Sequence, residues 1–175
     1  MSTAMHSTPI YQNFSEIKST ARSYLIVLEQ EDLNVLQDIQ ANIDEAVPTK
    51  TMALSANSLD DLATLEQALI EYVATAQAGL HSVVYGSEVF LWQVHRILIQ
   101  LGCLADEVSL IQSSTQTLKK VYCVHCGYLQ ETQAPEFCHC EQCKVHLHIR
   151  SHFSQRLGAY MGVCANAHQP MGFAS

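Results

Sequence analysis

The sequence predicts an α/β domain followed by a small, cysteine-rich β module. Three observations lead to this prediction. Short apolar runs alternate with segments of helical periodicity in the first two thirds of the chain. Two Cys-x-x-Cys pairs then follow within residues 123–143. The formal net charge of −8 falls entirely on residues 1–120, whereas residues 121–175 are neutral and hold six of the nine histidines.

The α/β pattern begins after a polar stretch, residues 1–20, which we expect to form a flexible N-terminal arm. Residues 23–28 are an apolar run, which we interpret as a buried strand, and we expect a second short strand at residues 50–55. Leucine and isoleucine recur at helical spacing in the segment between them. That helix should end before Pro48, because the residue before a proline disfavours helical geometry.

The alternation then repeats twice. A helix opened by Ser58 and closed at Gly79 leads to a strand at residues 81–85. A helix over residues 88–101 leads to a last strand at residues 108–111. Helical connections between short buried strands require a parallel sheet with right-handed crossovers. We therefore expect a small parallel-sheet α/β domain over residues 21–118.

The two Cys-x-x-Cys pairs are Cys123 with Cys126 and Cys140 with Cys143. A two-residue spacer lets both sulfurs of a pair turn toward one ion, and Gly127 suits the positive φ of such a turn. Two pairs at this separation predict a four-thiolate metal site. Zinc is the favoured ion, because closed four-cysteine sites are typical of it, and a rubredoxin-like iron is the alternative.

Cys138 adds a fifth cysteine beside the second pair. It is either a substitute ligand for Cys140 or a spare thiol. The spacing of the five cysteines does not match that of ferredoxins, which argues against an iron–sulfur cluster. Cys103 and Cys164 are isolated in the sequence, so we expect them to be structural.

The module over residues 119–175 is expected to be a zinc ribbon with a tail, in which the metal replaces a core too small to hold itself together. Its second Cys-x-x-Cys pair leads into a strand over residues 144–150, which alternates apolar and polar side chains. His146, His148, Arg150 and His152 fall on one face. We expect that face to lie in solvent, with a second metal or anion site as the alternative.

Composition excludes several functions. The negative charge argues against nucleic-acid binding, and no apolar run reaches the length of a membrane span. The N-terminus has no secretory signal, and seven cysteines fit a reducing cytoplasm better than a disulfide framework. No spacing supports a nucleophile or acid–base pair, so we assign no catalytic residue. The turn at residues 83–88 lacks a Gly-x-Gly-x-x-Gly, which leaves a nucleotide-binding regulator as an alternative only.

Two further motifs follow the cysteine pairs, at residues 152–154 (His-Phe-Ser) and 158–163 (Gly-Ala-Tyr-Met-Gly-Val). With these residues, the segment from Tyr122 to Ala167 resembles the C-terminal part of the DmmA-like subunit of dimethylamine monooxygenase. Residues 83–102 are similar to the last helix region of ferredoxin-reductase NAD-binding domains. The strand there usually ends in Cys-Gly-Pro, whereas this chain has Tyr-Gly-Ser at residues 85–87, which argues against nicotinamide binding.

The resemblance implies a non-catalytic subunit of a multicomponent oxygenase that oxidatively N-demethylates small secondary amines. Sister subunits would carry the catalytic iron or haem, and the flavin and iron–sulfur reductase. This chain would then support assembly or electron delivery. The amine and the subunit stoichiometry do not follow from the sequence.

Overall fold

The computed structural model describes residues 8–18, 20–54, 61–113 and 118–166. The described residues divide into two compact units: an α/β unit within residues 10–113, and a β unit of residues 118–166 together with residues 8 and 9. Each unit is described by itself.

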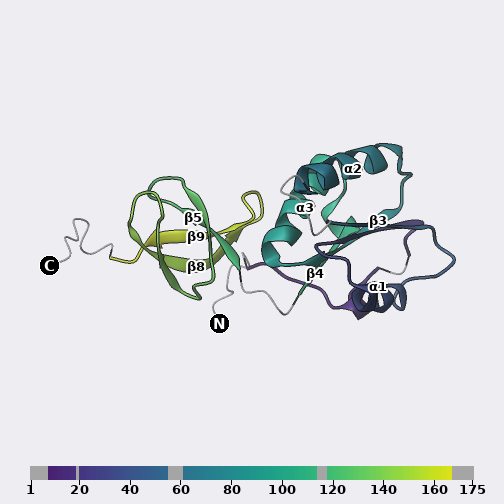
Figure 1. Cartoon of the computed structure of the whole chain (residues 1–175), viewed down its shortest axis with the longest axis horizontal. Coiled ribbons are helices and arrows are strands. Elements are labelled where there is room, and N and C mark those ends of the chain that lie inside the picture. The colour runs from purple at the N-terminus through teal and green to yellow at the C-terminus, as the bar shows by residue number, and fades with distance from the viewer. Residues whose placement is uncertain (1–7, 19, 55–60, 114–117, 167–175) are drawn as a thin grey trace, which may run out of the picture. The chain divides into compact units, whose positions relative to one another are not determined.

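The α/β unit is a four-stranded parallel sheet with the strand order β2-β1-β3-β4. Figure 1 shows helices α2 and α3 on one face of the sheet and α1 on the other. The expected parallel α/β sheet is therefore confirmed. The strands are β1 (Ser23–Leu28), β2 (Thr49–Ala53), β3 (Leu80–Gly86) and β4 (Val108–Gln112). The helices are α1 (Leu33–Gln40), α2 (Asp61–Thr75) and α3 (Glu88–Gln100).

Local sequence explains where these elements begin. Asp32 caps α1, because its carboxylate accepts from the backbone N–H groups of Asn34 and Val35. Ser87 caps α3 by accepting from Phe90 N. The N-cap expected at Ser58 lies outside the described residues. Strand β1 is buried from its second residue to its last, as a central strand covered on both faces must be.

The N-terminal segment differs from the flexible arm that we expected. Its described part from Ile10 onward packs on the α/β unit, with a 3₁₀ turn at Phe14–Glu16. Gln12 N donates to the carbonyl of Leu110 on edge strand β4 at 2.8 Å. Ile17 is only 6% exposed and joins the core beneath β1. Phe14 packs against the same core. Two isolated apolar side chains in a polar stretch are a weak sequence signal, so the sequence did not predict that this segment packs on the core.

A buried polar contact strengthens this attachment. The Tyr11 hydroxyl donates to the carboxylate of Glu88 and accepts from the indole N–H of Trp92 at 3.0 Å. Glu88 lies in the first turn of α3, where the helix dipole also favours a carboxylate. The N-terminal segment is therefore held to α3 as well as to β4.

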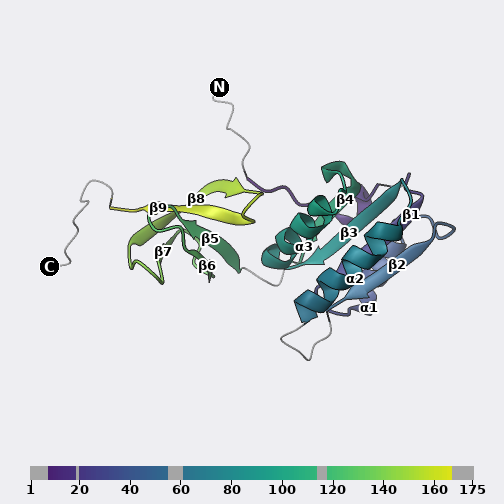
Figure 2. The same cartoon turned by 90° about the horizontal axis from the view of Figure 1, so that it is seen from above.

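The β unit is a five-stranded sheet with the order β6-β5-β9-β8-β7. Its strands are β5 (Lys119–Cys123), β6 (Leu129–Thr132), β7 (Phe137–His139), β8 (His146–Ser154) and β9 (Ala159–Cys164). Strands β5 and β9 pair in parallel and all other neighbours are antiparallel. Figure 2 shows the β6–β5 and β7–β8 hairpins in this unit.

Strand β9 corrects the expectation of a tail after the second cysteine pair. Residues 159–164 form the central strand of the sheet, between β5 and β8. The turn before it uses Gly158 at φ +61°, a conformation that favours glycine. Phe153, just before that turn, is 5% exposed and packs edge-on against Tyr160 at a ring separation of 4.9 Å. The His-Phe-Ser and Gly-Ala-Tyr-Met-Gly segments thus build the β8–β9 hairpin.

Among the described residues, no helix is both long enough and apolar enough to cross a membrane.

Candidate metal centre

The sulfur atoms of Cys123, Cys126, Cys140 and Cys143 all lie within 4.8 Å of one another. Each pair sits in the turn of a hairpin, the first between β5 and β6 and the second between β7 and β8. We call these two turns, residues 123–128 and 140–145, the first and second knuckle. The fold therefore brings together the four cysteines that the spacing singled out.

The two knuckles have the same backbone hydrogen-bond pattern. In each, the carbonyl of the first cysteine accepts from the N–H four residues on, and its own N–H donates to the carbonyl five residues on. The partners are Gly127 and Tyr128 in the first knuckle, both at 2.8 Å. They are Lys144 and Val145 in the second, both at 2.9 Å. This repetition indicates one turn geometry used twice.

The residue after each second cysteine adopts positive φ. Gly127 has φ +78°, as its sequence position suggested, and Lys144 has φ +60°. Lys144 is the one non-glycine residue with positive φ among the described residues. A left-handed conformation costs an L-residue roughly 1–2 kcal/mol. The turn that orients the sulfurs of the second knuckle therefore includes backbone strain at Lys144. Sequence reasoning missed this position because lysine gives no signal for it.

Backbone N–H groups point at the cysteine sulfurs in a matched pattern. The first cysteine of each knuckle receives two: His125 and Cys126 approach Cys123, and Gln142 and Cys143 approach Cys140. The second cysteine of each knuckle receives one, from the residue two positions on. Such groups stabilise the thiolate form that a metal requires.

The pKa values of the four thiols are shifted in different directions. Burial raises the pKa of Cys123 despite these backbone N–H groups. At Cys140, burial acts in the same direction, but the N–H groups of Cys143 and Gln142 and the adjacent thiols outweigh it and lower its pKa to about 7. Cys140 is therefore the thiol of the four that ionises most easily.

The cluster fits a tetrahedral metal ion. A metal–sulfur distance of about 2.3 Å places neighbouring sulfurs of a tetrahedron about 3.8 Å apart. The Cys123 and Cys143 sulfurs are 3.7 Å apart, and those of Cys126 and Cys140 are 3.6 Å apart. Cys123 and Cys140 are fully buried, whereas the other two sulfurs are partly exposed. Four thiolates in this arrangement suit either zinc or iron in geometry.

Strand β9 supports the first knuckle. The Gly162 carbonyl accepts from Val124 N, inside the knuckle, at 3.0 Å. A Cβ at Gly162 would lie 2.8 Å from Val121 Cγ1 and 3.0 Å from Leu147 Cδ1, so a larger residue would push β9 away from β5. The Gly-Ala-Tyr-Met-Gly segment therefore has a packing role beside the cluster.

The three remaining cysteines lie outside the tetrahedron. Cys138, on β7, is half-buried beside the cluster, and burial together with the nearby Cys140 and Cys123 raises its pKa. Burial likewise raises the pKa of Cys103. All seven cysteines are free thiols.

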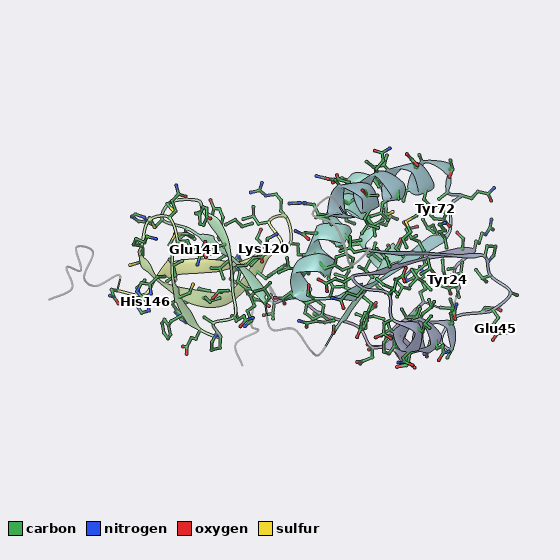
Figure 3. All side chains as sticks on the ribbon, viewed as in Figure 1. Tyr24, Glu45, Tyr72, Lys120, Glu141 and His146 are labelled. Carbon is green, nitrogen blue, oxygen red and sulfur yellow. The ribbon has the colours of Figure 1, made fainter. Side chains whose placement is uncertain are left out.

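The histidine stripe belongs to a group of stacked rings. His139 and His146 pair across β7 and β8 with ring centroids 4.8 Å apart, and Phe137 stacks on His148 at 5.0 Å. Figure 3 labels His146 among the side chains of the β unit. The opposite face holds the buried Leu147 and Ile149, as the alternation predicted. Among the described residues, the four cysteines are the one group of three or more side chains placed to share a metal ion.

The α/β unit carries a carboxylate at its topological switch point. Strands β1 and β3 are neighbours whose helices leave on opposite faces, and ligands of open α/β sheets bind at such a point. Glu29 follows β1, and its carboxylate accepts from Ser87 N at 2.6 Å and from Ser87 Oγ at 2.7 Å. A phosphate would need these same donors at the start of α3. The nucleotide-binding alternative is therefore not favoured at this position.

An α/β unit followed by a β unit with a four-cysteine cluster defines a two-part protein with a candidate metal centre. Residues 120–163 match the family model described as the dimethylamine monooxygenase subunit DmmA-like, C-terminal domain. The chain is 40% identical over 117 residues to the heme-dependent oxidative N-demethylase delta subunit of Ectopseudomonas mendocina (strain ymp). That alignment covers 67% of this chain and 66%, just under two thirds, of the relative. No solved structure matches the chain significantly. The chain belongs to the DmmA-like family.

Proposed function

We propose that this chain is a metal-stabilised, non-catalytic subunit of a multicomponent amine monooxygenase. Its relative is named as a subunit of an oxidative N-demethylase, which supports a place in an oxidative demethylating system. The non-catalytic role is inferred from the closed geometry of the four-cysteine cluster. Four thiolates fill every position of a tetrahedral ion and leave none for dioxygen or an amine. A metal held in this way stabilises a fold.

The proposed reaction is the oxidative N-demethylation of a small secondary amine such as dimethylamine. One oxygen atom of dioxygen enters a methyl C–H bond, and the resulting carbinolamine breaks its C–N bond to give formaldehyde and the primary amine. The second oxygen atom leaves as water, which requires an electron pair and protons from a reductant. Sister subunits with a haem or iron oxygenase centre and a flavin and iron–sulfur reductase would supply these steps.

This chain would hold such partners together or help electrons pass between them. The charge of the molecule lies on the α/β part, which would present an acidic surface to an oxygenase or reductase subunit. The free thiols fit a reducing cytoplasm. The β unit would keep its shape through the metal, for which we propose zinc because a redox-silent ion suits a structural site.

A rubredoxin-like iron carrier is the second candidate. The matched N–H groups around the sulfurs, and the partial exposure of Cys126 and Cys143, favour it. Hydrogen bonds to sulfur and solvent exposure are the features that tune the potential of an iron–thiolate centre. Iron in this site predicts a coloured protein that bleaches on reduction, whereas zinc predicts a colourless one.

Affinity purification of the tagged chain from its native host, grown on a methylated amine, tests the proposed role. We expect an oxygenase subunit and a flavin reductase to elute with it and the eluate to release formaldehyde from dimethylamine. The Cys140→Ser variant should lose these partners, whereas Cys103→Ser should keep them. A chain that elutes alone with its metal still bound would contradict the proposal.

A further inference from the structure

Gln130 is a buried polar residue at an edge of the β unit. It lies on β6, opposite Val121 of β5, and only 5% of its surface is exposed. Glutamine is mostly exposed in proteins, and a buried amide is tolerated where its hydrogen bonds are satisfied. The hydrogen bonds of the Gln130 amide therefore indicate its structural role.

The Gln130 amide bonds the backbone on both sides of Cys140. Its Nε2 donates to the carbonyl of His139 at 2.9 Å, and its Oε1 accepts from Glu141 N at 2.9 Å. The side chain thus copies the donor and acceptor of a neighbouring strand. Strands β6 and β7 are the two opposite edges of the sheet. Because Gln130 of β6 bonds the backbone at the end of β7, the sheet must curl enough to bring its two edges together.

The same amide also contacts the competing thiol. Gln130 Nε2 lies 3.7 Å from the sulfur of Cys138. Cys138 and Cys140 are two residues apart on an extended segment, so their side chains point to the same face. A bulge of the chain between Cys138 and Cys143 would therefore offer Cys138 to the metal in place of Cys140, while Cys143 kept its position.

We propose that Gln130 is a positioning residue that selects Cys140 rather than Cys138 as the fourth metal ligand. This inference rests on the proposed metal site. The amide fixes the peptide groups before and after Cys140 relative to the β5–β6 hairpin. It also donates a hydrogen bond to the Cys138 sulfur, which keeps that sulfur away from the metal. Residues that orient metal ligands in this way typically contribute about 10–100-fold to metal affinity.

The Gln130→Met variant tests the proposal, because methionine keeps the length and the burial but removes the hydrogen bonds. Gln133→Met is the matched control, since Gln133 is an exposed glutamine just after β6 and outside both knuckles. We expect Gln130→Met to release its metal to a chelator at least about tenfold faster than the control. Alkylation of the metal-loaded protein should label Cys138 and spare Cys140 in the control. In Gln130→Met, protection should be shared between the two thiols.

A second variant separates ligand selection from a general loosening of the fold. In Gln130→Met with Cys138→Ala, the competing thiol is absent, so full protection of Cys140 should return. The cobalt-substituted protein should then show one four-thiolate spectrum instead of the mixed spectrum of Gln130→Met. General loosening would not be rescued by the removal of a further side chain.

Equal release rates and equal alkylation patterns in Gln130→Met and Gln133→Met would overturn the inference and leave the metal site intact. Failure to regain Cys140 protection when Cys138 is removed would also overturn it. Alkylation of all four cluster cysteines in the unmodified protein would instead show that the proposed metal site fails. The inference that rests on it would fail with it.

Discussion

The α/β unit and the β unit are stabilised in different ways. The α/β unit buries nearly all of β1 and β3 and most of α3, and Tyr24, Ile26 and Val84 are fully inaccessible. The core of the β unit is one small cluster, in which two of the five buried residues are the cysteines Cys123 and Cys140. The first unit can fold on apolar burial, whereas the second has two candidate metal ligands where a larger domain would place apolar side chains.

This difference shows how a small sheet with few buried apolar residues can be held in one arrangement. The four-cysteine cluster joins two hairpins, and the Gln130 amide bridges the two sheet edges beside it. The cysteine cluster and the amide lie next to each other, because the amide bonds the backbone on both sides of Cys140. The comparison predicts that changes in one unit leave the stability of the other nearly unaltered.

Metal removal should give the largest effect and should be confined to the β unit. Binding of a structural zinc contributes about 10–16 kcal/mol in isolated zinc modules, so a chelator should unfold residues 118–166. Amide hydrogen exchange resolved by residue measures this. The α/β unit should keep its protection, and Cys103→Ser should behave as the unmodified protein does. Loss of protection in both units together would break the comparison.

A cavity in the α/β unit should have the converse effect. Leu98 is fully buried on α3, so Leu98→Ala should destabilise this unit by about 2–5 kcal/mol through lost burial and an unfilled cavity. Urea unfolding followed by Trp92 fluorescence reports on this unit, because the tryptophan lies on the same helix. Metal release from the β unit should be unchanged. A faster release would show that the two units are coupled.

One matched pair of glycine substitutions compares overpacking in the two units. A Cβ at Gly162 would meet Val121 at 2.8 Å, and a Cβ at Gly86 would meet Glu29 Cβ and Phe90 at 2.7 Å. Each change to alanine should cost about 1–3 kcal/mol, through strain in its own unit only. Metal-release rates and Trp92 fluorescence distinguish the two sites. If Gly162→Ala left metal release unaltered, β9 would not support the first knuckle.

Acid should weaken the α/β unit through His81, with a smaller effect. Burial, and then the nearby Lys18, lower the pKa of His81, which lies 2.8 Å from the Ser109 hydroxyl. The unfolded chain therefore takes up this proton first as the pH falls below about 6.5. Stability is fully present above that pH and declines as the pH falls toward the folded-state pKa, by at most about 1.4 kcal/mol per pH unit.

The His81→Gln variant checks this assignment, because glutamine does not titrate and keeps a polar group near Ser109. Urea midpoints of the Trp92 transition, measured from about pH 7.5 to about pH 5, should fall less steeply than those of the unmodified protein. An unchanged slope would assign the acid sensitivity to other groups.

The sequence predicted the α/β sheet well because β1, β3 and β4 are short apolar runs between helical segments. Strand β1 was expected at residues 23–28 and lies there, and β4 extends one residue past its expected end. These strands are central or covered on both faces, so their apolar side chains report their environment directly. The packed N-terminal segment was not predicted, since only Ile17 and a few aromatic residues attach it.

The β unit shows the limit of such reasoning. The cysteine spacing identified the four clustered sulfurs, because two-residue spacers impose the knuckle turn. Strand β9 was interpreted as a tail, although an apolar run after Gly158 is a strand signal that could have located it. Gln130 and Lys144 gave no signal. The role of each depends on residues brought together only in the folded chain.

The central claim is that the four cysteines hold one metal ion that keeps the β unit folded. Elemental analysis of the purified protein, together with its visible spectrum, tests this claim most directly. We predict one zinc atom per chain, no visible colour, and loss of the metal in Cys140→Ser but not in Cys103→Ser. One iron atom with thiolate charge-transfer bands would keep the site and make this chain part of the electron path. A metal-free protein whose β unit remains folded would contradict the account.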